Sequence, residues 1–100
     1  MRNYKLYIGL NVADGKDWER QDAINVIISI CKAKGITALS VSECQGVYTY
    51  TTGETVFENT VVLTLIDTTV DVKELTLCIK SALRQECVMV QEILDKFSFI

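Results

Sequence analysis

The hydrophobic positions of the sequence fall into strand-like and helix-like stretches. Between residues 3 and 11, Tyr4, Leu6, Ile8 and Leu10 alternate with other residues, a period of two that predicts a strand. Similar patterns predict strands over residues 36–51, with a bulge near Gly46, and over residues 55–67 and 86–93. The sequence "TTGE" at residues 51–54 predicts the turn between the second and third strands.

Two other stretches carry the period of an amphipathic helix. The first runs from about residue 18 to residue 34, with Asp17 as the predicted N-cap and Gly35 as the residue that follows the last turn. Its apolar face consists of Ile24, Ile27, Ile28 and Cys31. The second helix follows Asp71, which with Glu74 resembles a capping box. Its predicted apolar face consists of Val72, Leu75, Ile79, Ala82 and Leu83.

The order of these elements is β-α-β-β-α-β, which is typical of a ferredoxin-like α+β domain. It predicts one domain over residues 1–100, with a four-stranded antiparallel sheet and both helices on one face. The third strand is apolar on both of its faces, whereas a sheet with one face in water should alternate more clearly. We therefore expect another subunit to cover the second face. The alternative is that the apolar tail after residue 93 covers it.

Composition and charge exclude several classes of function. Apolar residues make up 49% of the 100 residues, enough for a packed core. The net charge is −3 and basic residues are scattered, which argues against nucleic-acid binding. No stretch is long and apolar enough for a membrane span or a signal peptide, so a cytoplasmic location is expected.

Cysteine and histidine usage narrows the chemistry further. The four cysteines are far apart in sequence, and we expect them to be reduced and mostly buried. The chain has no histidine, so a zinc site and a histidine-dependent nucleophile are both disfavoured. No phosphate-binding or dinucleotide-binding glycine motif is present. The sequence predicts no metal and no cofactor.

The remaining candidates for chemistry are tyrosines and acids near strand ends. Tyr48 and Tyr50 are two residues apart and should point to one face of the second strand. Glu58 interrupts the otherwise apolar third strand, and Glu86 opens the predicted last strand. Each of these residues, taken alone, also suits a structural or solvent-facing position. Trp18, at a predicted helix start, is more typical of a core or hydrophobic-staple residue than of a ligand platform.

Three stretches together resemble the small bacteriophage enzymes that cleave S-adenosylmethionine, formerly called hydrolases and now described as lyases. The stretches are "KGITALSVSECQGVYTYTTGE", "FENTVVLTLID" and "RQECVMVQE". The residues that fit the family pattern extend over roughly residues 35–92. They are Gly35, Ser40, Val41, Gly46, Tyr48, Glu58, Thr60, Val61, Asp67, Gln85, Glu86, Cys87, Val88 and Val90.

The resemblance implies a specific site and reaction. Members of this family form PII-like trimers with ligand sites between subunits, and convert S-adenosylmethionine to 5′-methylthioadenosine and homoserine lactone without metal or cofactor. Tyr48 and Glu58 match the family's catalytic pair, and Glu86 and Tyr50 are expected to bind the substrate in the same cleft. The interval from Tyr48 to Glu58 is one residue shorter than in the family. A shift in strand register would therefore put Glu58 on the other face.

Two other classes of function stay open at this point. The same trimer could be a PII-like protein that binds a nucleotide or another small molecule without turning it over, as a sensor or a sponge. It could also be a structural adaptor that uses the apolar sheet face only to oligomerise. A fold alone does not decide between these classes, because function depends on the site. If the lyase resemblance holds, the chain acts in the host cytoplasm, where it depletes S-adenosylmethionine and blunts methyl-dependent restriction.

Overall fold

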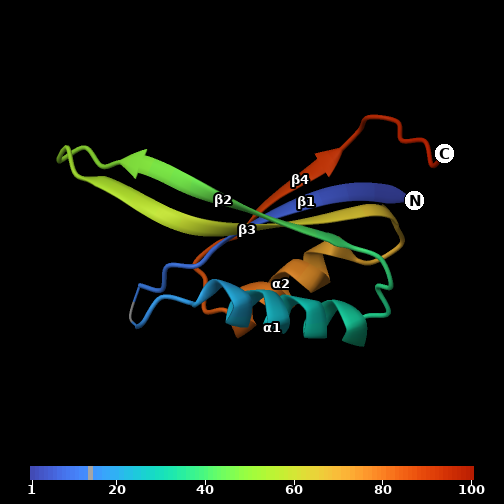
Figure 1. Cartoon of the computed structure of the whole chain (residues 1–100), viewed down its shortest axis with the longest axis horizontal. Helices are drawn as coiled ribbons and strands as arrows, with labels where there is room; N and C mark the ends of the chain where they lie inside the picture. Colours follow the sequence, from blue (N-terminus) through green and yellow to red (C-terminus); the bar gives the residue numbers. More distant parts are fainter. Residues whose placement is uncertain (14) are drawn as a thin grey trace.

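The computed structural model describes residues 1–13 and 15–100 (Figure 1). The stretch "ADGKD" at residues 13–17, whose turn-forming residues end the first strand pattern, includes residue 14, which lies outside the described residues. The elements follow the predicted βαββαβ order. They are β1 (Arg2–Gly9), α1 (Arg20–Ala33), β2 (Ser40–Thr49), β3 (Thr55–Thr68), α2 (Val72–Ala82) and β4 (Met89–Ile93).

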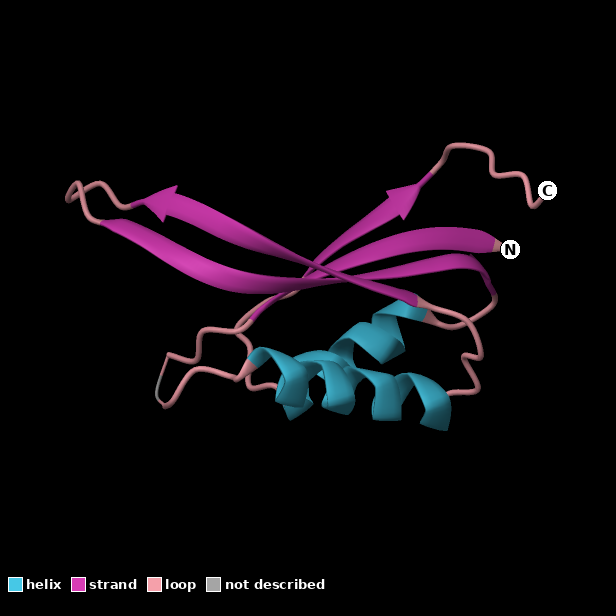
Figure 2. Cartoon of the chain, in the orientation of Figure 1, coloured by secondary structure: helices cyan, strands magenta, loops and turns pink. Residues whose placement is uncertain are grey.

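The four strands form one antiparallel sheet in the order β2-β3-β1-β4. Both helices pack against the same face of this sheet, and the opposite face is left uncovered by helices (Figure 2). The predicted ferredoxin-like α+β fold is therefore confirmed. Because β1 and β3 are the two central strands, their helix-facing residues lie at the centre of the core.

The core is the layer between the sheet and the helices. Alternate residues of β1 and β3 point into it, and one stripe of each helix closes it from the other side. Its fully buried large side chains are Leu6, Ile8, Leu10, Ile27, Cys31, Val61, Leu63, Leu65, Leu75, Ile79 and Leu83. Trp18 packs against this layer and donates from Nε1 to the carbonyl oxygen of Leu83, at 2.9 Å. It is a partly buried residue at the edge of the core, which agrees with the prediction of a core or staple residue.

The β2–β3 hairpin extends well beyond the helices (Figure 1). The radius of gyration is 14.4 Å, larger than the roughly 13 Å of a compact domain of this length. Arg20, the first residue of α1, joins the helix to the base of the hairpin. Its guanidinium lies 3.1 Å from Glu43 of β2 and donates to Asn59 of β3, also at 3.1 Å.

The start of α1 differs from the prediction. Asp17 is not the N-cap of α1. That position belongs to Glu19, whose side chain accepts from the Asp22 amide at 2.9 Å. The Trp18 amide donates to Leu10 and its indole to Leu83, so Trp18 is held outside the helix. Gly35 does follow the helix in the left-handed conformation, with φ +79°.

The second helix confirms half of its predicted capping box. Asp71 is the N-cap, and its carboxylate accepts from the Glu74 amide at 3.2 Å. The Glu74 side chain does not reach back to Asp71, because it pairs with Lys34 of α1 at 2.7 Å. Ala82 was wrongly placed on the apolar face, since it is exposed at the end of the helix.

Two predicted strands are shorter than expected. Residues 36–39 are not paired, because Ile36 and Leu39 pack against the core on the way from α1 to the sheet edge. The last strand begins at Met89, so Glu86 lies in the loop before it and does not open the strand. The predicted bulge near Gly46 was also wrong. The register of β2 with β3 is regular, and the irregularity lies between Arg2 and Tyr4 of β1.

The cysteines and the C-terminal tail also differ from expectation. All four cysteines are free, but Cys44 and Cys87 are exposed and only Cys31 is fully buried. The tail does not cover the open sheet face. It leaves the end of β4 (Figure 1), with Leu94 84% and Phe99 80% exposed. Within residues 1–13 and 15–100, no helix is long and apolar enough to cross a membrane.

Candidate functional site

A pocket of about 600 Å³ lies where β1 ends and β4 begins, on the face of the sheet away from the helices. The pocket is lined by all four residues predicted to form the site, although they come from different segments. Tyr48 lies in β2, Tyr50 in the β2–β3 turn, Glu58 in β3 and Glu86 in the α2–β4 loop. Glu86 reaches the pocket from the loop, not from the strand position predicted for it.

The register of the hairpin puts Tyr48 and Glu58 on the same face. Gly46 lies directly opposite Glu58, and Tyr48 lies directly opposite Val56. Residues two apart on a strand share a face, so Gly46 and Tyr48 of β2 face the same way as Val56 and Glu58 of β3. The shorter interval between Tyr48 and Glu58 therefore does not move Glu58 off the face of the candidate site.

Glu58 is held by the backbone of the segment that follows β1. Its Oε2 atom accepts from the Asn11 amide at 3.2 Å, and the half-buried side chain extends over Gly9. The Leu10 amide donates to the Asn59 carbonyl at 2.9 Å, which keeps the two segments in register next to the carboxylate. Among the described residues, no donor is hydrogen-bonded to Oε1. That oxygen is available to a ligand.

Tyr48 and Tyr50 form an aromatic pair at the rim of the pocket. The pKa of Tyr48 is raised, first by hydrogen bonding to Tyr50, then by desolvation and by electrostatic interactions with Tyr50, Glu58 and Glu86. A tyrosine whose ionisation is opposed by nearby acids stays a neutral phenol at physiological pH. Its hydroxyl can therefore donate a hydrogen bond to a ligand.

The loop that carries Glu86 is tied to the same backbone that holds Glu58. The side-chain amide of Gln85 donates to the Asn11 carbonyl at 3.0 Å and to the Leu83 carbonyl at 3.3 Å. Arg84, in the left-handed conformation with φ 54°, reverses the chain after α2 and also lines the pocket. The backbone of Asn11 is thus bonded both to Glu58 and to Gln85, the residue that precedes Glu86.

Several pocket residues carry no signal in the sequence that would single them out. Gly9 and Asn11 belong to the predicted first strand, and Tyr7 reads as one of its alternating residues. In the structure, the Tyr7 hydroxyl donates to Gln91 of β4 at 3.0 Å, beside the pocket. Arg84 reads as a charged residue at a helix end. Only the fold, which brings these segments together, identifies them as neighbours of Glu58.

The pocket contains acidic and aromatic side chains together with one guanidinium, that of Arg84. Within residues 1–13 and 15–100, no group of three or more histidine, cysteine or acidic residues could hold a metal ion. The arrangement suits a ligand that carries positive charge and presents hydrogen-bond acceptors to phenol groups.

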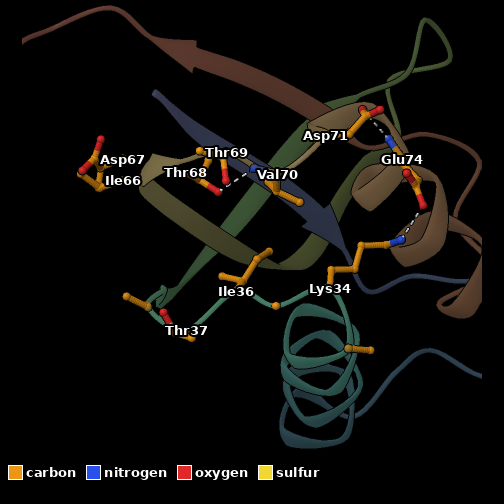
Figure 3. Close-up of a pocket in the computed structure, with 13 residues that line it drawn as sticks. Lys34, Ile36, Thr37, Ile66, Asp67, Thr68, Thr69, Val70, Asp71 and Glu74 are labelled. Atoms are coloured by element: carbon orange, nitrogen blue, oxygen red, sulfur yellow. Dashed lines mark hydrogen bonds and ion pairs between the residues drawn. The ribbon is translucent and has the colours of Figure 1, made fainter.

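A second pocket, of about 510 Å³, lies at the other end of the sheet between the α1–β2 and β3–α2 connections (Figure 3). Several of its polar groups are paired with one another. Lys34 contacts Glu74 at 2.7 Å, and the Val70 amide donates to the Thr68 hydroxyl at 3.2 Å. A binding site needs polar groups that converge on a ligand, so we regard this pocket as structural.

Among solved structures, those of a phage SAM lyase are similar to this chain. A phage SAM lyase in complex with S-methyl-5′-thioadenosine is 28% identical, with a TM-score of 0.73, over 92% of this chain and 79% of that one. The same kind of enzyme in the apo state is 29% identical, with a TM-score of 0.68, over 91% of this chain and 79% of that one. Over most of its length, this chain is therefore similar in sequence and structure to phage SAM lyase.

Two more distant structures share only the fold with this chain. The GlnK–ATP complex from B. subtilis is 17% identical, with a TM-score of 0.63, over 92% of this chain and 82% of that one. CutA1 from Oryza sativa is 14% identical, with a TM-score of 0.60, over 98% of this chain and 84% of that one. No protein-family model matches the sequence, and no curated protein sequence matches it significantly.

Proposed function

We propose that the protein is an S-adenosylmethionine lyase that forms 5′-methylthioadenosine and L-homoserine lactone. The observation that carries the proposal is that Tyr48, Tyr50, Glu58 and Glu86 line one pocket. The similarity to phage SAM lyase, including a complex with S-methyl-5′-thioadenosine, supports the choice of substrate.

The proposed reaction needs little chemistry from the protein. A carboxylate oxygen of the substrate forms a bond to its own γ carbon, while the bond from that carbon to sulfur breaks. The electron pair of the broken bond stays on sulfur, which leaves as a neutral thioether. The positive charge of the sulfonium and the negative charge of the carboxylate both disappear, and no proton is transferred. No external nucleophile, metal or cofactor is required.

The protein's part is to fold the methionyl chain and to hold its charges. Bringing the carboxylate oxygen to within about 3–3.5 Å of the γ carbon converts a rare conformation into a reactive one. Because opposite charges cancel in the transition state, removal of water from the carboxylate favours the reaction. Glu58, anchored through Oε2, binds the cationic part of the substrate through its other oxygen. Tyr48 donates a hydrogen bond that fixes the fold of the chain, while Glu86 and Tyr50 contribute to binding.

We also propose that the protein is a homotrimer with its sites between subunits. In the single chain, Tyr48 is 43% exposed and Tyr50 is 50% exposed, so the pocket is open on the side of the hairpin. A neighbouring subunit over this face would exclude the water that now reaches the tyrosines. The expected biological consequence is depletion of S-adenosylmethionine in the host cytoplasm, which opposes methyl-dependent restriction.

The test is to incubate the purified protein with S-adenosylmethionine and to follow the products by chromatography with mass detection. Methylthioadenosine with homoserine lactone supports the proposal. Methylthioadenosine with homoserine that never passes through the lactone indicates a water nucleophile, with Glu58 as a general base. Thermal stabilisation by the substrate without turnover indicates a non-catalytic binding protein. If the protein neither binds nor cleaves S-adenosylmethionine, both of these functions are contradicted.

A further inference from the structure

The backbone conformation of Gly9 does not require glycine. Its φ angle is not positive, whereas Gly35 and Gly53 lie in the left-handed region. Gly9 is the last residue of β1, one of the two central strands of the sheet. Glycine weakens a strand because it has no side chain to pack. A glycine at such a position commonly marks a close approach of another group to the backbone.

The group that approaches Gly9 is the carboxylate of Glu58. A Cβ atom at position 9 would lie 2.5 Å from Cδ and Oε2 of Glu58 and 2.6 Å from Oε1. These distances are far inside van der Waals contact, so the carboxylate occupies the space that a side chain at position 9 would fill. Two residues further along, the Asn11 amide donates to Oε2. Gly9 supplies the space and Asn11 supplies the donor.

Gly46 provides the contrast, because it flanks Glu58 on the other side. It lies directly opposite Glu58 in the β2–β3 ladder. A Cβ atom there would lie 3.7 Å from the Glu58 carbonyl oxygen and 3.7 Å from the Thr60 hydroxyl, which is ordinary contact. The Glu58 side chain therefore leans toward β1, and only one of the two neighbouring glycines is needed for its position.

We infer that Gly9 is a positioning residue, which fixes the Glu58 carboxylate on the floor of the pocket with one oxygen held by Asn11 and the other toward the ligand. The functional consequence rests on the proposed lyase function, while the position of the carboxylate does not. The same chain of contacts extends to Glu86, since Gln85 donates to the carbonyl oxygen of Asn11.

The substitution Gly9→Ala tests this role without removing any polar group. The obstacle is the far end of a flexible side chain, so the carboxylate moves and the strand remains. We expect the midpoint of thermal unfolding to stay the same or rise, because alanine reduces the entropy of the unfolded chain. We expect kcat/KM for S-adenosylmethionine to fall by about 10- to 100-fold, since small displacements of a catalytic group are costly. Gly46→Ala is the matched control, with kcat/KM expected to stay within about twofold.

Two further measurements separate positioning from general damage. The chemical shift of the Asn11 amide proton should follow the titration of the Glu58 carboxyl in the wild type and in Gly46→Ala, and should lose that dependence in Gly9→Ala. Gly9→Ala should also weaken S-adenosylmethionine binding in the wild-type background, yet add no further loss to Glu58→Gln.

The outcomes are distinct for the two proposals. If the Asn11 amide keeps its pH dependence in Gly9→Ala, or if Gly9→Ala and Gly46→Ala lower activity equally, the positioning role is wrong. If the wild type neither binds nor cleaves S-adenosylmethionine, the proposed function fails. In that case, the pH dependence of the Asn11 amide still tests whether Gly9 fixes the position of the Glu58 carboxylate.

Discussion

The rings of Tyr48 and Tyr50 meet edge to face, with centroids 5.5 Å apart and planes inclined by 86°. Aromatic pairs prefer this geometry because the positive edge of one ring faces the negative face of the other. The pair stands at the rim of the pocket that contains Glu58 and Glu86. A change at Tyr50 should therefore alter the pKa of Tyr48, which Tyr50 raises.

Replacing Tyr50 by phenylalanine should lower the pKa of Tyr48. The hydroxyl of Tyr50 is the largest cause that raises this pKa, and the substitution removes it while the ring remains. The measurement is a titration of tyrosinate absorbance at alkaline pH, with Tyr48→Phe used to identify the signal of Tyr48. Tyr7→Phe serves as the control, because Tyr7 is not among the groups that raise the pKa of Tyr48. An unchanged titration of Tyr48 in Tyr50→Phe would contradict the coupling.

Removing the charge of Glu58 should weaken both the binding of S-adenosylmethionine and its turnover. Glu58→Gln keeps the shape of the side chain and its bond from Asn11, so the fold should be unaffected. Because the carboxylate would hold the cationic part of the substrate in the reactive fold, we expect kcat/KM to fall by about 100-fold or more. Glu86→Gln, on the exposed loop, should mainly raise KM. The measurement is the rate of methylthioadenosine formation at several concentrations of S-adenosylmethionine.

Glu54→Gln is the matched control for these two variants. Glu54 lies in the turn of the hairpin, is exposed and does not line the pocket. It tests whether a lower net negative charge on the chain, by itself, slows the reaction with a cationic substrate. Full activity of Glu58→Gln would exclude the role proposed for that carboxylate. If Glu54→Gln lowers activity as much as Glu86→Gln does, Glu86 contributes only through long-range electrostatics.

The hairpin that carries Tyr48 and Glu58 could be predicted because it depends on local rules, although its register was left open. Alternation along each strand assigns the faces, and the "TTGE" turn sets the hairpin register, with the Tyr50 amide donating to the Glu54 carbonyl at 2.8 Å. The order of elements then fixes the fold. These features depend on neighbours in the sequence or in one hairpin, where the pattern of residues contains the necessary information.

The floor and the loop side of the pocket could not be predicted in this way. The bond from Asn11 to Glu58 spans 47 residues and the bond from Gln85 to Asn11 spans 74. No periodicity reports contacts at such separations. Glu86 was assigned to a strand because apolar residues follow it, but the loop that contains it is bonded to Asn11 instead of to β1. Cys87 is exposed for the same reason.

The bond from Trp18 to Leu83 should contribute to stability independently of function. The indole Nε1 donates at 2.9 Å to the last turn of α2 in a half-buried setting, so it joins the start of α1 to the end of α2. Trp18→Phe leaves most of the packing but removes the donor and leaves a carbonyl with one partner fewer. We expect the free energy of unfolding to fall by about 1–3 kcal/mol. The measurement is denaturant unfolding, and Leu63→Ala, at a fully buried core position, should cost about 2–5 kcal/mol as a reference.

The N-cap of α1 should make stability depend on acidity. Hydrogen bonds from the Gln21 and Asp22 amides lower the pKa of Glu19 below its ordinary value. A group with a lowered pKa in the folded state stabilises the protein above its unfolded-state pKa, and this stabilisation is lost as the pH falls through the lower, folded-state pKa. Glu19→Gln should therefore lower the midpoint of thermal unfolding by a few degrees at pH 7. The difference between the two proteins should shrink as the pH falls below 4.5, the ordinary pKa. A difference that does not depend on pH would argue against the charged cap.

The hairpin carries an apolar pair that the chain itself leaves uncovered. Phe57 and Val47 lie directly opposite each other and are 59% and 56% exposed. They belong to the face that the helices cover further along the sheet, but the helices end before this part of the hairpin (Figure 1). If neighbouring subunits cover the hairpin in the proposed homotrimer, Phe57→Ser should weaken assembly without unfolding the monomer.

Light scattering coupled to gel filtration measures this effect. We expect the wild type to have the mass of a trimer and Phe57→Ser to dissociate at concentrations at least about tenfold higher, because burial of one phenylalanine contributes roughly 1.5–3 kcal/mol. Leu77→Ser is the control, since Leu77 is 54% exposed but lies on α2, away from the hairpin. A wild-type mass of one chain would contradict the trimer. Equal dissociation in both variants would indicate that the hairpin pair is not part of the interface. Selective dissociation of Phe57→Ser, with loss of turnover at low protein concentration, would connect assembly to an active site completed by a neighbouring subunit.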